Sequence, residues 1–168
     1  MKFLVFSDSH KSTNGMDKAI ERHKDITHII HCGDVADDCE YLEMVYGRTH
    51  SICAVCGNND FFSHYPFERI IKCEGHMIFV THGHKERVKS GLYNLRAKGK
   101  EKNATMCIFG HTHEQFYEND DIQLLNPGSI GYIKQEYAVI DVNKDEIKVN
   151  LYRTGDVYEI KKKTYRDK

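Results

Sequence analysis

The apolar residues of this chain are concentrated in short runs, and most of these runs end abruptly in a turn. Residues 3–6 read Phe-Leu-Val-Phe, which is typical of a strand buried on both faces. Similar runs predict further strands over residues 28–32, 50–55, 67–73, 76–80, 106–109, 115–118, 122–125, 137–142 and 146–152. Apolar residues at helical spacing predict helices from Thr13 or Asn14 to Lys24, from Asp37 or Asp38 to Tyr46, and from Ser90 to Lys98.

The order of these elements predicts an α/β fold. In the first third of the chain strands alternate with helices, which implies right-handed crossovers and parallel pairing of the first three strands. The second half changes character, because Glu74-Gly75 is a short turn between two strands and indicates an antiparallel hairpin. We expect one domain over residues 1–168, since this length is enough to bury a substantial core without disulfides or a structural metal.

Five of the predicted strands end in turns that carry metal-binding types of side chain. The turns are Ser7-Asp8-Ser9-His10, Gly33-Asp34, Gly57-Asn58-Asn59-Asp60, Thr81-His82-Gly83-His84 and Gly110-His111-Thr112-His113. Each alone has an ordinary explanation as a turn or a solvated loop. Together, at the carboxyl ends of strands where open α/β sheets bind ligands, they predict a metal site. The carboxylates, imidazoles and amides suffice for two ions that share one carboxylate.

These five blocks resemble the signature of the calcineurin-like metallophosphoesterases. The loop Asn126-Pro127-Gly128-Ser129, which we expect to be a structural turn beneath the site, also resembles the small bacterial and archaeal phosphodiesterases of that superfamily. The resemblance implies a sandwich of two mixed sheets flanked by helices. It also implies two divalent ions, one held by Asp8, His10, Asp34 and His113, the other by Asp34, Asn58, His82 and His111.

The function that the resemblance implies is hydrolysis of a small phosphate ester, most simply by a phosphodiesterase. A hydroxide that bridges the two ions would attack phosphorus, and both ions would spread the developing charge. Asp34, as a short carboxylate, is the residue expected to bridge the ions. Mixed nitrogen and oxygen ligands without thiolate favour Mn²⁺, with Ni²⁺, Zn²⁺ or Fe as alternatives, over Mg²⁺.

One block departs from the pattern of the superfamily. Many members have His where this chain has Asn59, and that His helps to protonate the leaving group, oriented by the following acid, here Asp60. An amide cannot donate a proton at a useful pKa, so we expect a preference for good leaving groups unless His84 or a metal-bound water supplies the proton. Alternatively, His84 hydrogen-bonds a ligand or solvent, or it contacts the substrate phosphate. The predicted catalytic residues are Asp34, Asn58, Asp60 and His84.

Composition narrows the possible partners and the compartment. A net charge of −1 gives no overall attraction to nucleic acid, and no apolar run approaches the roughly 20 residues of a membrane span. Met1-Lys2 leads directly into a strand without a cleavage site, so we expect a cytoplasmic protein. Its six cysteines are then expected to be reduced, and Cys53 and Cys56 to point to opposite faces of their strand.

Two further segments leave alternatives open. Residues 85–102 contain seven Lys or Arg against two Glu, which fits either a solvated helix face or a groove that attracts phosphate-bearing substrates. Nucleic-acid binding has no support outside this segment. Phe61, Phe62 and Tyr65 are candidates for an exposed homodimer contact, and residues 161–168 for a frayed polar tail. The rival functions are a phosphomonoesterase and a non-catalytic interaction scaffold on the same fold, similar to a retromer subunit.

Overall fold

The computed structural model describes residues 1–34, 36–61, 63–131 and 135–154. Its strands are β1 (Lys2–Phe6), β2 (His28–His31), β3 (Ser51–Ala54), β4 (Glu68–Cys73), β5 (His76–Thr81), β6 (Met106–Ile108), β7 (Gln115–Glu118), β8 (Gln123–Pro127), β9 (Glu136–Val142) and β10 (Ile147–Arg153). Its helices are α1 (Asn14–Arg22), α2 (Ala36–Tyr46) and α3 (Tyr93–Glu101), with a short 3₁₀ turn at Val88–Ser90. Every predicted strand and helix is present, with ends that shift by a few residues.

The strands form two five-stranded sheets, with the orders β10-β9-β1-β2-β3 and β4-β5-β6-β8-β7. In the first sheet β1, β2 and β3 are parallel, while β9 is antiparallel to β1 and to β10. In the second sheet β5, β6 and β8 are parallel, and β4 and β7 are antiparallel strands at its two edges. Both sheets are therefore mixed, and the predicted parallel pairing of the first three strands is confirmed.

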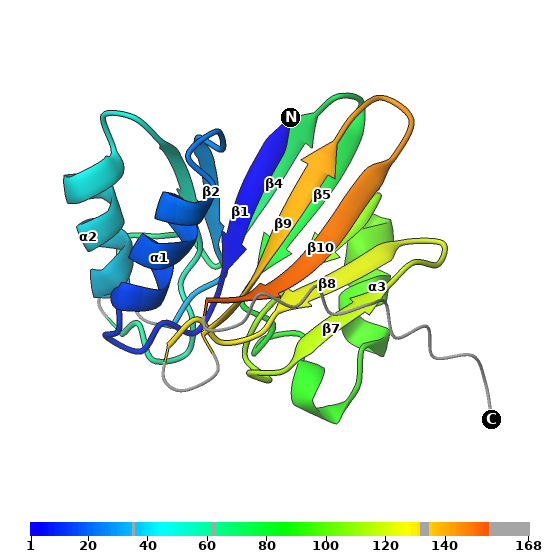
Figure 1. Ribbon diagram of the computed structural model, residues 1–168. Helices are drawn as coiled ribbons and strands as arrows, with labels where there is room; N and C mark the ends of the chain where they lie inside the picture. Colours follow the sequence, from blue (N-terminus) through cyan, green and yellow to red (C-terminus); the bar gives the residue numbers. More distant parts are fainter. Residues whose placement is uncertain (35, 62, 132–134, 155–168) are drawn as a thin grey trace.

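Helices cover the outer face of each sheet (Figure 1). Helices α1 and α2 lie against the first sheet, where Met16 and Leu42 pack with Phe6. Helix α3 lies against the second sheet, where Leu95 packs with Phe79. The layers thus run helix, sheet, sheet, helix, and the expected sandwich of two mixed sheets flanked by helices is confirmed.

The interior between the sheets is built from strand residues of both. Val5 of β1 packs there in one apolar cluster with Val80 and Ile108 of the second sheet. Successive residues of a strand point to opposite faces, so Leu4 and Phe6 face the helices instead. This explains the uninterrupted apolar run at the start of the chain, because β1 is buried on both of its faces.

The predicted hairpin is confirmed, whereas the third helix and the loop after residue 125 differ from expectation. Glu74 and Gly75 have φ of 51° and 87°, the left-handed pair typical of a type I′ turn. Helix α3 begins at Tyr93 instead of Ser90, because Val88–Ser90 form a 3₁₀ turn that is followed by Gly91 with φ 136°. The Asn126-Pro127 pair, expected in a loop, belongs to β8.

The six cysteines are unpaired. Cys53 packs against the interior between the sheets, whereas Cys56 packs in a separate cluster with Cys39. The two residues of the C-x-x-C pattern therefore face different surroundings, as predicted.

The aromatic residues after β3 do not form one exposed patch. Phe61 is 83% exposed, but Tyr65 is only 7% exposed and packs with Cys39 and Ala54, so its predicted exposure is wrong. Burial follows because residues 63–66 return the chain to the sheet, where the Cys56 amide donates to the Pro66 carbonyl oxygen at 2.9 Å. Phe62 and residues 161–168 lie outside the described residues.

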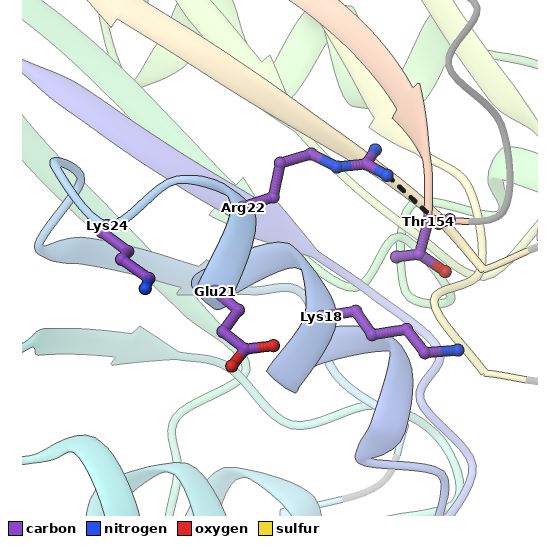
Figure 2. A pocket seen from close by; sticks show the side chains of 5 residues that line it. All are labelled: Lys18, Glu21, Arg22, Lys24 and Thr154. Carbon is purple, nitrogen blue, oxygen red and sulfur yellow. Dashed lines mark hydrogen bonds between the residues drawn. The ribbon is translucent and has the colours of Figure 1, made fainter.

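The last described residues are held against the end of α1 (Figure 2). The Arg22 guanidinium donates to the carbonyl oxygens of Arg153, at 3.0 Å, and Thr154, at 3.2 Å. The hollow here, about 410 Å³, is lined by Arg22, Thr154 and the charged ends of Lys18, Glu21 and Lys24, and includes none of the ligand-type turns. None of the described helices has the length and apolar character that a membrane crossing requires.

His31 is a buried residue of β2 that contacts two of the ligand-type turns. Its side chain is fully buried at the end of β2. The Gly33 amide donates to Nδ1 at 3.2 Å, so the proton of the neutral ring lies on Nε2, which donates to Ser9 Oγ at 3.1 Å. Burial lowers the pKa of His31 to about 4.

The metal-free protein is expected to lose stability as the pH falls from 6.5 to about 4, because in that window the unfolded chain protonates His31 and the folded chain does not. His31→Asn keeps an acceptor near the Gly33 amide and is expected to reduce the slope by up to about 1.4 kcal/mol per pH unit. Urea unfolding at several pH values measures the slope, with His64→Asn at an exposed histidine as control. Equal slopes for wild type and His31→Asn would contradict the buried neutral ring.

Candidate metal centre

The ligand-type turns meet at one edge of the sandwich. They follow β1, β2, β3, β5 and β6, and within each sheet these strands run parallel to one another. Two groups of potential metal ligands form there, Asp8 with His10 and His113, and Asp34 with His82 and His111. Within each group the ligand atoms all lie within 4.8 Å of one another. Each group thus combines residues of both sheets.

The backbone of these turns is unusual. Five of the six group members have φ between 48° and 70°, namely Asp8, His10, Asp34, His111 and His113. For an L-residue this left-handed region costs about 1–2 kcal/mol, and such strain is concentrated at functional sites. The turns also pack closely: a β-carbon at Gly110 would overlap the Ser7 hydroxyl, and one at Gly57 would overlap the Asp34 carboxylate. This explains glycine beside the ligands.

In the first group the nitrogens and the carboxylate converge on a common point. His113 Nε2 lies 3.1 Å from Asp8 Oδ1 and 3.2 Å from His10 Nε2. Two ligand atoms about 2.1 Å from one ion, at angles of about 90–110°, are about 3.0–3.4 Å apart. Both of these distances fit a shared cation, whereas the third, from His10 Nε2 to Asp8 Oδ1, is longer at 3.9 Å.

Asp8 supplies the strongest test of that fit. Its Oδ2 accepts from the Ser7 hydroxyl at 2.6 Å and from the His111 amide at 3.0 Å. Its Oδ1 is completely buried and has no hydrogen-bond partner in the described structure, although imidazole nitrogens surround it. A buried carboxylate oxygen needs a compensating positive charge, which either a proton on His113 or a cation among these nitrogens would supply.

The second group adjoins the first. His82 Nε2 lies 3.2 Å from His111 Nδ1, 3.5 Å from Asp34 Oδ2 and 4.0 Å from Asp8 Oδ1. His82 Nδ1 lies 2.7 Å from the Cys32 carbonyl oxygen, which only accepts, so Nδ1 carries the proton. Its Nε2 therefore faces Asp34 and His111, as in a histidine ligand held by a backbone carbonyl, and can bind a cation once the Nε2 proton is displaced.

The turn Gly57-Asn58-Asn59-Asp60 packs onto Asp34. The Asn59 amide donates to Asp34 Oδ1 at 3.0 Å, and Asn59 Nδ2 donates to Oδ2 at 2.6 Å. Asp60 Oδ2 accepts from the amides of Gly57, at 2.6 Å, and Asp34, at 3.1 Å. Asn59 and Asp60 thus hold the Asp34 side chain and backbone in place.

The charges of the groups are strongly coupled. Burial acts to raise the pKa of both Asp8 and Asp34, but contacts with His113 and His82 respectively outweigh it and lower both pKa values. The contact with Asp8 raises the pKa of His113, while burial would lower that of His82 but is outweighed by Asp34. Burial and the charge of His82 lower the pKa of His111 to about 4, which keeps that ring neutral and able to bind a cation.

The remaining predicted residues lie at the margin of the groups. Asn58 is exposed in the turn after β3, and its role as a ligand stays a prediction. The His84 ring lies 5.4 Å from the His82 ring and 5.9 Å from the Phe67 ring, between ring centroids. His84 Nδ1 is enclosed and has no hydrogen-bond partner among the described residues. The catalytic roles of Asn58, Asp60 and His84 also stay predictions.

Two contacts beside the ligands were missed in the sequence, and two others come from the expected loop 126–129. Ser7 orients Asp8, and Asp38, expected to cap a helix, lies in the first turn of α2 and accepts from the Lys11 amide at 2.8 Å. Asn126 Nδ2 donates to the Gly110 carbonyl oxygen at 3.0 Å, and Ser129 Oγ donates to the Asp8 carbonyl oxygen at 2.8 Å. The expected support of the site by residues 126–129 is thereby confirmed. The available signal was only that these polar residues are next to ligands or beside a strand end.

The basic segment 85–102 divides into two parts. The ion pairs of its second part join Arg96 to Glu118 and Asp121, Lys98 to Glu68 and Glu86, Lys100 to Asp121, and Lys102 to Glu68 and Glu101. In the first part Lys85 lies over the Phe67 ring, and Arg87 and Lys89 form no ion pair within the described residues. The cations of the second part are thus paired with acidic residues. Only the first part has cations without an ion-pair partner among the described residues.

A sandwich of mixed sheets with Asp and His groups at its strand ends defines an α/β metalloprotein. The family model of the calcineurin-like phosphoesterase superfamily domain matches residues 1–145, and the chain belongs to this family of metallophosphoesterases. The resemblance noted in the sequence is thereby confirmed. The family implies hydrolysis of phosphoric esters with divalent metal ions, and the two ligand groups are the candidate binding sites.

Three similar proteins match the chain to different degrees. The chain is 30% identical over 158 residues to the probable metallophosphoesterase YsnB of Bacillus subtilis, covering 90% of each chain. It is 30% identical over 171 residues to the phosphodiesterase MJ0936 of Methanocaldococcus jannaschii, covering 87% of this chain and 96% of that protein. The Zn²⁺ complex of Vps29 from Entamoeba histolytica has a TM-score of 0.75 at 19% identity, over 94% and 95% of the chains, which shows the fold alone.

Metal binding is expected to tighten as the pH rises above 6.5. The pKa values of His82 and His113 are raised above that value, so a cation must displace protons from them, and this becomes easier as the pH rises. While both rings are protonated, we expect about a tenfold gain in Mn²⁺ affinity per pH unit for each proton displaced. Calorimetry in two buffers of different ionisation enthalpy measures the protons released. Equal affinity at pH 6 and pH 8 would contradict this coupling.

Proposed function

We propose that this protein is a phosphodiesterase that uses two divalent cations, one in each ligand group. The observation that carries the proposal is that the groups adjoin, since Asp8 Oδ1 lies 4.0 Å from His82 Nε2 of the other group. The likeness to MJ0936, which is named a phosphodiesterase, supports the choice of diester over monoester. When bound, such a pair of cations supplies hydroxide at neutral pH and polarises the phosphoryl oxygens.

The chain itself contributes orientation and charge. Asp34 is proposed to join the two groups, and Asn59 fixes both of its carboxylate oxygens. The carbonyl of Cys32 keeps the Nε2 lone pair of His82 available. We propose Asn58 as a further ligand of the second group, because its amide is exposed beside Asn59. These side chains are fixed before substrate arrives, so little reorganisation is needed during the reaction.

We further propose Mn²⁺ as the metal and the cytoplasm as the compartment. Imidazole nitrogens and carboxylate oxygens without thiolate suit Mn²⁺, Ni²⁺, Zn²⁺ or Fe better than Mg²⁺. The unpaired cysteines are in keeping with a reducing compartment. The scaffold alternative is not better supported, because the likeness to Vps29 is one of fold alone, whereas the family model is that of a phosphoesterase domain.

Asp34→Asn is expected to lower Mn²⁺-dependent hydrolysis of an aryl phosphodiester by at least about 100-fold, since loss of a ligand costs more than loss of its supporting contacts. The measurement compares the diester with the matching monoester, using metal-stripped protein resupplied with Mn²⁺. Asp37→Asn, an exposed acid in the first turn of α2, is the matched control. Two bound ions per chain without turnover of either ester would contradict the proposal and favour the scaffold.

Asn59→His is expected to raise kcat/KM for esters with poor leaving groups relative to esters with good ones. The Asn59 amide is engaged with Asp34 and has no acidic proton, whereas an imidazolium could protonate a departing alkoxide. Hydrolysis of aryl esters with a graded series of leaving-group pKa values measures the effect as a change of slope. An unchanged slope for Asn59→His would show that position 59 does not limit leaving-group departure.

The variant His84→Gln tests whether His84 is the alternative source of the proton for the leaving group. If His84 protonates the leaving group, this variant steepens the same slope, with poor leaving groups losing most. A uniform loss for all leaving groups would instead assign His84 to phosphate contact.

A further inference from the structure

A pocket beside the ligand groups has no part in metal binding. It has a volume of about 490 Å³ and lies between the 3₁₀ turn Val88–Ser90 and the start of β7. Val88, Lys89 and Leu92 line one side, and Thr112, Glu114 and Phe116 are among the residues of the other. Its size is that of a pocket for a small organic molecule.

Both sides of this pocket are continuous with the ligand turns. Thr112 lies between His111 and His113 in the chain. On the opposite side, the Val88 amide donates to the Gly83 carbonyl oxygen at 3.2 Å, and the Val88 side chain packs so closely on Gly83 that a β-carbon there would meet it. Gly83 follows His82 directly. A phosphate held at the ligand groups would therefore have one of its substituents beside this pocket.

The pocket offers a specific combination of groups. Gln115 is engaged, because its Nε2 donates to the carbonyl oxygens of Tyr137 and Tyr152, and the Thr112 hydroxyl accepts from Asn126. Lys89 and Glu114 are both exposed, and neither has an ion-pair partner among the described side chains. One free donor and one free carboxylate thus stand over apolar and aromatic side chains.

Resting on the phosphodiesterase proposed above, we propose that this pocket binds the nucleobase of a nucleoside phosphodiester. A nucleobase has flat apolar faces that pack on Phe116 and aliphatic side chains, and its edge carries both acceptors and donors. Lys89 donates to a ring nitrogen or carbonyl oxygen of the base, and Glu114 accepts from its exocyclic amine. A second phosphate would fit poorly, because Glu114 repels it.

The test compares two diesters with the same leaving group, deoxycytidine 5′-(4-nitrophenyl) phosphate and methyl 4-nitrophenyl phosphate. The Mn²⁺ enzyme is expected to hydrolyse the nucleoside ester with a kcat/KM roughly 10- to 100-fold higher, the effect of hydrogen bonds to charged groups. Lys89→Gln and Glu114→Gln should each lower that ratio about tenfold. Lys100→Gln, in the same basic segment but paired with Asp121, is the matched control and should keep the ratio.

A second readout needs neither metal nor turnover. Free deoxycytidine added to the metal-free protein should shift the amide NMR signals of residues 88–92 and 112–116, and Glu114→Gln should weaken the response. Hydrolysis of both diesters at equal rates, with no shifts at these residues, would overturn the nucleobase pocket and leave the phosphodiesterase standing. Shifts at these residues without hydrolysis of any ester would support the pocket and overturn the phosphodiesterase.

Discussion

The arrangement of the turns at this sheet edge depends on a single buried carboxylate oxygen, Asp8 Oδ1. Two donors saturate the other oxygen of Asp8, and three imidazole nitrogens from different turns lie within 4.0 Å of this one. This oxygen is buried, so a proton or a cation among these rings is needed to compensate the charge. The left-handed turns, the close approach of Gly110 and the anchoring by Ser129 all maintain an arrangement that is unfavourable without a cation.

The sequence predicted those features that depend on local pattern. Apolar runs located every strand, and the residues at the strand ends located the edge where the ligands gather, because chain direction in a parallel sheet brings successive turns to the same edge. The division of these residues into two ligand groups was implied by the resemblance to the metallophosphoesterases. Features that depend on distant partners were missed. Tyr65 looked exposed because nothing nearby in the sequence shows that it packs on Cys39, and Asp38 looked like a helix cap although it binds the Lys11 amide.

The basic segment shows the same limit for electrostatics. A count of charges in residues 85–102 suggests one cationic surface, but four of its seven cations have acidic partners, several of which come from other parts of the chain. Glu68 of β4, for example, forms ion pairs with both Lys98 and Lys102. Only the cations without an acidic partner among the described residues are available to bind a ligand, and these lie next to the His82 turn. Net charge along a sequence therefore says little until the partners are known.

The position of β1 has a consequence for how the chain folds during its synthesis. Of the described strands this one is synthesised first, yet in the sheet it lies between β2 and β9, and its register with β9 pairs Lys2 with Asp141. Ser129 and residues 130–131 also hold the backbone of Ser7 and Asp8. Asp8 therefore lacks these contacts through most of translation, and the edge of β1 that pairs with β9 stays open until β9 has been synthesised. The geometry of this ligand group is consequently completed late, after nearly the entire described chain has been synthesised.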